Sequence, residues 1–243
     1  GARVVGVSNY TTWPPEAAAK PKCGGFFDPG YERMLSLEPD LIIGQGIAAD
    51  LKPFAQDNGI ELVLLDLTDL ESIFREIRRV GSVLEVPERA ELVCARMNYR
   101  LAEVRVKAAG RPRVPVLLVT GREQGSLSSI STVGPGTFLD DLIEVAGGRN
   151  VFSDLPRGYA VINKETLLAR APEVIVELHG EGGDSEKALR RVRTLWAGLG
   201  TLPAVRQGRV YVITATYAMI PGPRVVEIAD RLGDLLHRRP SDG

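Results

Sequence analysis

The sequence predicts an α/β protein with two lobes, each built on a parallel β-sheet and joined to the other by one long rigid helix. Two observations predict this class. Short apolar segments alternate with longer amphipathic segments along most of the chain, which is the pattern of strand–helix–strand units. A helical segment that starts at Pro87 separates two such series. We therefore divide the chain into a first lobe at residues 1–86, a connecting helix at 87–109 and a second lobe at 110–243, with a ligand cleft between the lobes.

The connecting helix is predicted from composition and period. Residues 88–109 contain no glycine or proline and are rich in Ala, Leu, Glu and Arg, which favour helix. Pro87 suits a first helical turn, and Gly110 with Pro112 ends the segment. At 1.5 Å per residue such a helix spans roughly 35 Å, about the width of a small domain. Its apolar residues recur mostly every three or four positions, at Leu92, Val93, Met97, Leu101, Val104 and Ala108.

The first lobe is predicted to begin with a buried strand at residues 3–8, because this segment is rich in β-branched residues. A long loop rich in Pro and Gly follows it. The remaining elements are a helix at 28–38, a strand at 39–44, a helix at 48–59, a strand at 61–66 and an amphipathic helix at 70–85.

The second lobe repeats this alternation. Its predicted elements are a strand at 114–120, a loop at 121–136, a helix at 137–147, a helix and then a strand within 164–180, a helix at 184–199, a strand at 209–214, a loop to residue 223 and a closing helix at 224–239.

The composition excludes several classes of function. The 30 basic and 31 acidic side chains give a net charge of −1, which argues against a nucleic-acid partner. Two cysteines are too few for a disulfide scaffold, and Cys94, among apolar residues, is expected to be a core thiol. The sequence leaves open whether Cys23 is reactive. We expect no resident cofactor or metal.

Signals for catalysis are weak, so we expect no enzyme. The two histidines, His179 and His237, are far apart in the sequence, and no metalloprotease, P-loop or nucleophile-elbow motif occurs. Asp140 and Asp141 are adjacent on a helix and so face different directions. Glycines at 134 and 136 precede Thr137, a candidate helix cap. They indicate either a tight turn, which we favour, or an anion site.

Aromatic and polar residues in the loops predict a ligand site. Tyr10 and Trp13 follow the first predicted strand, and Tyr217 follows the last. Gln45 and Arg122 also follow strands, and ligands of open parallel sheets bind at the carboxyl ends of the strands. Aromatic faces suit a large flat ligand, which a few polar groups would orient.

The segments that carry a resemblance to a known family extend over nearly the whole chain. VVGVSNYTTWPPEA and GGFFDPGYERMLSLEPDLIIG in the first half, with VGPGTFLDDLIEVAGGRNVF, NKETLLARAPEVIVE and AVRQGRVYVI in the second, resemble periplasmic solute-binding proteins of ATP-driven importers for cobalamin, ferric siderophores and haem. The opening is most similar to the cobalamin-binding members. The resemblance implies two Rossmann-like lobes, little hinge motion, a monomer, and a periplasmic or membrane-anchored extracellular location with an export signal that this chain does not contain.

The resemblance also implies roles for particular residues. Tyr10 matches the family tyrosine at the lip of the cleft, and Tyr217 stands where cobalamin binders place a tryptophan. Gln45 falls in a loop that lines the cleft. The family docks on its permease with one acid per lobe, for which Asp50 matches the first place. Met219 stands at the second place, and Glu165 could substitute for it.

Two departures from the family pattern bear on these expectations. The family usually carries a strand and a helix before the segment that matches residues 4–8, so we expect part of the first lobe to be missing. The loop after residues 39–44 lacks a tryptophan that the most similar cobalamin binders carry.

The sequence therefore predicts an extracytoplasmic receptor that captures a metal chelate, with cobalamin or another corrinoid first, and delivers it to a membrane ABC permease. A ferric siderophore would need converging cations, for which Arg122 and Arg157 are the candidates. Haem would need an axial ligand such as Tyr10. Two other classes remain open, because α/β lobes host many activities: an enzyme or metallocluster-handling protein, and a sensory module without a transporter.

Overall fold

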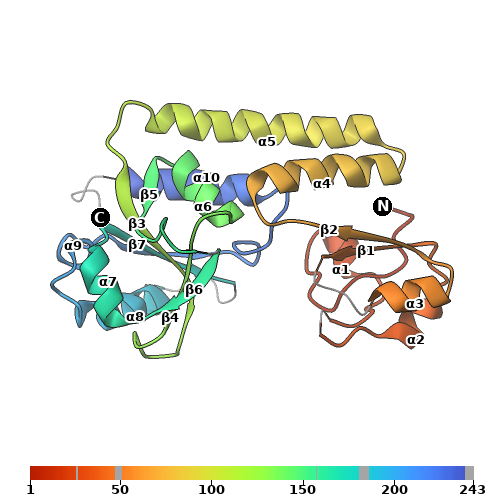
Figure 1. The fold of residues 1–243 in the computed structure, drawn as a ribbon, viewed down its shortest axis with the longest axis horizontal. Helices are drawn as coiled ribbons and strands as arrows, with labels where there is room; N and C mark the ends of the chain where they lie inside the picture. The colour runs from red at the N-terminus through yellow and green to blue at the C-terminus, as the bar shows by residue number, and fades with distance from the viewer. Residues whose placement is uncertain (26, 47–50, 157, 181–185, 239–243) are drawn as a thin grey trace. The chain divides into compact units, whose positions relative to one another are not determined.

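The computed structural model describes residues 1–25, 27–46, 51–156, 158–180 and 186–238. The chain forms two compact units, residues 1–66 (unit 1) and residues 67–243 (unit 2). Figure 1 labels most of the elements and colours the chain from the N-terminus to the C-terminus. Within the described residues, no helix has the length and apolar character needed to cross a bilayer.

The described residues of unit 1 form a two-stranded parallel sheet and three short helices. Strands β1 (Leu41–Gln45) and β2 (Glu61–Leu65) pair in register along their whole length. Helix α3 (Leu51–Asp57) packs on β2 and buries Ala55. The rings of Tyr31 and Phe54 lie 4.6 Å apart and join α2 to α3. The other helices are α1 (Pro15–Ala18) and α2 (Tyr31–Leu35).

The strand predicted at residues 3–8 is wrong. Val7 forms one isolated parallel bridge with Lys22, and Val4 and Val5 are 37% and 43% exposed. The backbone hydrogen bonds of this segment run to the following loop: Val7 N–H donates to Pro21 O at 3.0 Å, and Cys23 N–H donates to Val7 O at 2.9 Å. Because the segment pairs with a loop rather than with a strand, it forms no ladder.

Unit 2 is built on a six-stranded mixed sheet. Its order is β6-β4-β3-β7-β8, and β5 also pairs with β3. The β3/β5, β3/β7 and β7/β8 pairs are parallel, whereas β4 is antiparallel to β3 and β6. The strands are β3 (Val114–Arg122), β4 (Ile130–Val133), β5 (Gly148–Asn150), β6 (Tyr159–Ile162), β7 (Val174–His179) and β8 (Val210–Thr214).

The antiparallel strand β4 corrects the loop predicted at residues 121–136. The sequence there is rich in Ser and Gly, which are typical of loops. However, Ile130, Thr132 and Val133 are fully buried, and the Thr132 hydroxyl donates to Leu118 O at 2.7 Å. Tertiary pairing with β3 therefore overrides the local composition. The other predicted strands of the second lobe are confirmed.

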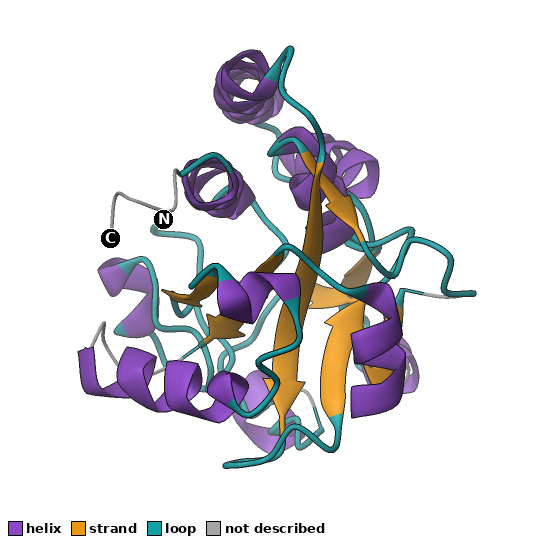
Figure 2. Ribbon diagram, turned by 90° about the vertical axis from the view of Figure 1, so that its left-hand side faces the viewer, coloured by secondary structure: helices purple, strands orange, loops and turns teal. Residues whose placement is uncertain are grey.

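Helices cover both faces of the unit 2 sheet (Figure 2). Val116 and Leu118 of β3 join the core under α4, α5, α6 and α10, whereas Leu117 and Val119 join the core under α7, α8 and α9. This alternation follows from the two-residue period of a strand. The helices are α4 (Leu70–Val83), α5 (Pro87–Ala108), α6 (Phe138–Val145), α7 (Lys164–Arg170), α8 (Glu186–Ala197), α9 (Pro203–Arg206) and α10 (Val225–Leu236).

Several local predictions in unit 2 are confirmed. Thr137 caps α6, since its hydroxyl oxygen accepts a hydrogen bond from Asp140 N–H at 3.2 Å. Asp140 accepts from the Asn150 amide and Asp141 from Leu70 N–H, so the two carboxylates do point apart. Cys94 is a buried free thiol whose pKa is raised by burial.

The long helix α5 matches the connecting helix predicted at 87–109 within one residue. Its inner face packs on α4 and α10, and α4 begins with a capping box between Asp69 and Ser72. The sequence division places α4 in the first lobe, but its contacts with α5 group it with unit 2. The α/β class, with two units that each contain parallel strands and with one long helix, is confirmed.

Candidate functional site

In unit 2 the loops that follow three neighbouring strands, β3, β7 and β8, meet at one edge of the sheet. Because β3, β7 and β8 are mutually parallel, their carboxyl ends lie together. Arg122 is the last residue of β3, His179 is the last residue of β7, and Tyr217 follows the end of β8. The structure thus brings two predicted site residues, Arg122 and Tyr217, to the same edge, and we call it the carboxyl edge of unit 2.

A buried carboxylate organises this edge. Glu177 of β7 is 1% exposed, and its Oε1 accepts hydrogen bonds from Arg122 Nε at 2.8 Å and from Trp196 Nε1 at 2.6 Å. Its Oε2 lies 2.8 Å from His179 Nε2. Burial would raise the pKa of the Glu177 carboxyl, but these three partners together hold it below its usual value. The carboxylate is therefore ionised at neutral pH, and both of its oxygens have hydrogen-bond partners.

This network changes what Arg122 can offer a ligand. The Arg122 side chain is 14% exposed, and its charge is balanced by Glu177. Its Nη1 also donates a long hydrogen bond of 3.4 Å to Glu123 O. An arginine expected from the sequence as a cation for the ligand is thus part of a buried ion pair.

Sequence reasoning missed two members of the network, Glu177 and Trp196. One signal was present: Glu177 interrupts the otherwise apolar strand Val-Ile-Val-Glu-Leu, and a charge inside a buried strand requires partners. His179 lies two residues further along the same strand and so on the same face, where Glu177 can orient its ring. One third of the His179 side chain is exposed.

Tyr217 lies half-buried where the loop after β8 meets α10. Its ring packs against the core, and the Arg224 guanidinium lies over it, 4.5 Å from the ring centre. Burial, and the hydrogen bond that the hydroxyl gives to Glu227, raise the pKa of Tyr217. Next to it, Met219 and Ile220 are 42% and 50% exposed. This loop adds an apolar rim to the carboxyl edge.

Unit 1 carries the other predicted ligand residues in exposed positions. Tyr10 and Trp13 are 74% and 56% exposed, and Gln45 is the exposed last residue of β1. The aromatic loop is held in place, since Lys22 Nζ donates to Thr11 O at 2.7 Å. The ligand-binding role of these three residues stays a prediction.

The residues predicted for permease docking are only partly described. Asp50 lies outside the described residues, as does Arg157. Glu165 is exposed in the first turn of α7. Their role stays a prediction.

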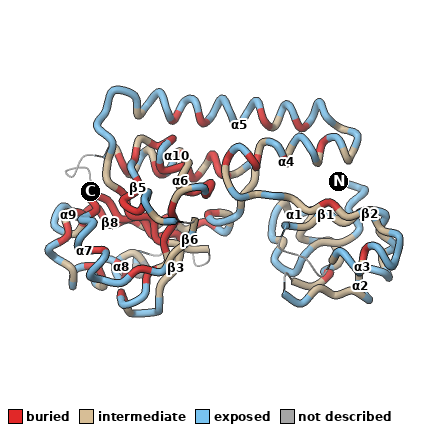
Figure 3. The backbone as a smooth tube through the Cα atoms, in the orientation of Figure 1, coloured by how far each residue is buried: buried red, intermediate tan, exposed pale blue. Residues whose placement is uncertain are grey.

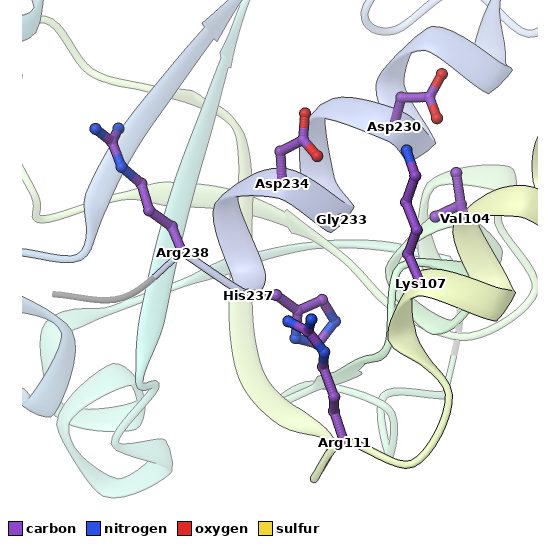
Figure 4. Close-up of a pocket in the computed structure, with 8 residues that line it drawn as sticks. All are labelled: Val104, Lys107, Arg111, Asp230, Gly233, Asp234, His237 and Arg238. Carbon is purple, nitrogen blue, oxygen red and sulfur yellow. The ribbon is translucent and has the colours of Figure 1, made fainter. Parts of the chain in front are cut away.

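Two hollows in unit 2 lie away from the carboxyl edge. One of about 270 Å³ lies between α5 and α10 and mixes basic and acidic side chains (Figure 4). There His237 Nε2 lies 2.9 Å from Ala146 O, and burial lowers the pKa of its imidazole. The second, of about 1020 Å³, follows α4, α5 and α6. Neither contains a predicted site residue, and the described residues hold no cluster of three metal-ligating side chains.

Residues 1–217 match the model of the family described as "Periplasmic binding protein", and the chain belongs to this family. The resemblance predicted from the sequence is confirmed, and the family is one of binding proteins. Among its relatives, the vitamin B12-binding protein of Salmonella typhi is 26% identical over 203 residues, which cover 83% of this chain and 73% of that protein. An uncharacterized ABC transporter substrate-binding lipoprotein of Bacillus subtilis (strain 168) is 24% identical, over 98% of this chain and 74% of that protein.

The fold is shared with solved structures of binding proteins. A periplasmic heme binding protein from Pseudomonas aeruginosa superposes with a TM-score of 0.79 at 27% identity. The match covers 98% of this chain and 85% of that chain.

Proposed function

We propose that the protein is the substrate-binding component of an ABC importer, which captures a metal chelate outside the cytoplasmic membrane and delivers it to the membrane permease. The observation that carries this proposal is the family match over residues 1–217. The names of the two relatives support it, since one is a vitamin B12-binding protein and the other an ABC transporter lipoprotein.

Within this class, cobalamin or another corrinoid is the first ligand. The carboxyl edge of unit 2 presents an apolar rim at Met219 and Ile220, beside the ring of Tyr217. A corrinoid has a wide apolar surface with uncharged amide edges, which suits exposed aromatic rings such as Tyr10 and Trp13.

The charge balance at this edge argues against an anionic siderophore. A trianionic ferric catecholate requires several cations that are free to bind it. The guanidinium of Arg122 is instead neutralised by Glu177 at 2.8 Å. The ligand site is therefore better suited to a chelate with little net charge.

Haem is the second candidate, and one contact favours it. His179 Nε2 is hydrogen-bonded to the Glu177 carboxylate. Such a hydrogen bond orients an imidazole for metal ligation through its other nitrogen, which here is Nδ1. The similarity to the heme binding protein of Pseudomonas aeruginosa supports the same candidate. Tyr10, which is exposed, is the alternative axial ligand predicted from the sequence.

A thermal-shift and titration panel tests the proposal. The purified chain is titrated with cyanocobalamin, cobinamide, haemin and a ferric tris-catecholate. Saturable binding of the corrinoids, with a melting temperature that rises with concentration, is expected. Saturation by haemin alone supports the second candidate, and saturation by the siderophore alone contradicts the argument from charge.

Two further outcomes separate transport from the other classes. A bound chelate recovered chemically unchanged is expected for a receptor, whereas turnover of it would support an enzyme. Absence of binding across the whole panel would contradict the chelate-receptor proposal and favour a sensory module for another ligand.

A further inference from the structure

Helix α5 carries two apolar stripes on opposite faces. The inner stripe is buried against the rest of unit 2 and consists of Ala90, Cys94, Met97, Leu101 and Val104. The outer stripe contains Leu92, Tyr99 and Val106, which are 59%, 65% and 74% exposed. Figure 3 shows buried and exposed residues alternating along α5. A helix that needed only to cover its own core would carry polar residues on the outer face.

The outer stripe has the spacing of a coiled-coil seam. Alanines lie between and beyond its large residues, so that the exposed positions 92, 95, 99, 102, 106 and 109 follow one another in alternating steps of three and four. This is the heptad pattern through which two helices interlock, with residues 92, 99 and 106 at the positions called a and residues 95, 102 and 109 at the positions called d. Helices α4, α6 and α10 pack against α5, and the inner residues Met97, Leu101 and Val104 belong to the core that these helices share.

We propose that the outer face of α5 binds a second copy of this chain, with the two helices antiparallel. In an antiparallel pair an a position of one helix faces a d position of the other. The register that aligns the two segments places Leu92 opposite Ala109, Tyr99 opposite Ala102, and Val106 opposite Ala95 of the second copy. Every large side chain then meets an alanine, so all layers have similar width. The surface is self-complementary, as two-fold symmetry requires.

The flanking charges fit the same register. Arg96 and Glu103 border the stripe on one side of the helix, both exposed. Neither takes part in an ion pair or hydrogen bond among the residues that the structure describes. The antiparallel register brings Arg96 beside Glu103 of the second copy and, by symmetry, Glu103 beside Arg96. Opposite charges at such flanking positions set partner and orientation.

A parallel pair fits less well. It would stack tyrosine on tyrosine and alanine on alanine, which gives alternating wide and narrow layers. The flanking charges of a parallel pair would be Glu91 and Arg96, but Glu91 already forms an ion pair with Arg78, whose Nε lies 2.8 Å from Glu91 Oε1. The antiparallel arrangement is therefore favoured. The resemblance of the sequence predicts a monomer, and this inference does not depend on the proposed ligand.

Charge reversal tests the register. Sedimentation equilibrium of the full chain over a wide concentration range is expected to show a monomer–dimer equilibrium. Arg96→Glu alone places like charges together at both symmetric sites, as does Glu103→Arg alone. Each variant should raise the dimer dissociation constant by about tenfold or more. The double variant should restore dimerisation, because it only exchanges the two charges.

A mixture of the two single variants gives the sharpest readout. Both flanking pairs in a mixed dimer join a glutamate to an arginine, so the two variants should associate with each other more tightly than either variant associates with itself. Arg190→Glu, on the exposed Arg190–Glu186 pair of α8, is the matched control and should leave the equilibrium unchanged. Circular dichroism checks that each variant folds.

Three outcomes would overturn the proposal. The first is a wild-type chain that stays monomeric at the highest concentration. The second is a dimer that Arg96→Glu does not weaken, which would place the interface elsewhere. The third is a monomer whose α5 face binds vesicles of anionic phospholipid, since this would assign the stripe to a membrane surface.

Discussion

Trp196 donates its indole N–H to the carboxylate of Glu177 at 2.6 Å, between helix α8 and strand β7. The indole is fully buried, so this hydrogen bond lies inside the core on that side of the sheet. The same oxygen also accepts from Arg122. The Glu177 carboxylate is thus held by side chains from α8, from β3 and, through His179, from β7 itself. The contribution of this network to protein stability can be tested separately from ligand binding.

Removal of Arg122 should destabilise the protein. The Arg122→Met variant leaves Glu177 buried without its cation, for which a loss of about 3 kcal/mol of unfolding free energy is expected. Urea denaturation at neutral pH measures it. Arg190→Met, which breaks an exposed pair, is the control and should cost about 1 kcal/mol or less. An Arg122→Met loss no larger than the control would show that the ion pair contributes little.

The pH dependence of stability should carry the signature of Glu177. Its pKa in the folded protein lies below the ordinary value of about 4.3. As pH falls, the unfolded chain binds the proton first, so this contribution is complete above the ordinary pKa and is lost as pH falls through the folded pKa. The Glu177→Gln variant should therefore be less stable than the wild type at pH 7, by a margin that narrows on acidification.

The quantity to measure is the difference in unfolding free energy between the wild type and the Glu177→Gln variant. Burial raises the pKa of Asp140 and Asp141, so these groups act in the opposite direction in both proteins and cancel. Urea midpoints measured at a series of pH values between neutral and acid give the margin. A margin that stays constant with pH would contradict the assigned ionisation of Glu177.

Tyr217→Ala should weaken binding of the ligand that saturates in the titration panel by roughly 1–3 kcal/mol, because an aromatic wall is lost. Since the ring also packs on the core, the unfolding free energy of the variant is measured alongside. Tyr159→Ala removes a tyrosine that is 60% exposed on β6 and is the matched control. Unchanged affinity in a folded Tyr217→Ala protein would remove Tyr217 from the site.

Trp13→Ala should lower ligand affinity with little effect on folding. The side chain is 56% exposed, so its loss opens no cavity in a core. Isothermal titration gives the affinity, and thermal unfolding without ligand should differ little from the wild type. A variant that binds normally would show that Trp13 lies outside the ligand site.

The sequence predicted those elements whose pattern is set locally. Helix α5 was found within one residue because its composition, its period and its bounding Pro87 and Gly110 all agree. Strand β7 was found because, apart from Glu177 and His179, its residues are apolar on both faces, as in a buried parallel strand. The cap at Thr137 followed from residue type and position.

The predictions that were wrong concern segments whose structure depends on pairing with other segments of the chain. Residues 130–133 become a strand only because β3 and β6 flank them. Residues 3–8 have a strand composition but pair with a loop. In the candidate site, Arg122 was recognised as a cation, but its neutralisation by Glu177, 55 residues away, could not be read from either local segment.

The alternation along β3 has a consequence for how the chain can vary. Successive residues of β3 pack in different cores, with Val116 and Leu118 on one face of the sheet and Leu117 and Val119 on the other. Exchange of one apolar residue for another of similar volume disturbs a single face. Insertion or deletion of one residue would instead move each subsequent side chain to the opposite face and disrupt both cores together. Length changes are therefore expected in the loops at the carboxyl edge, while β3 keeps its length.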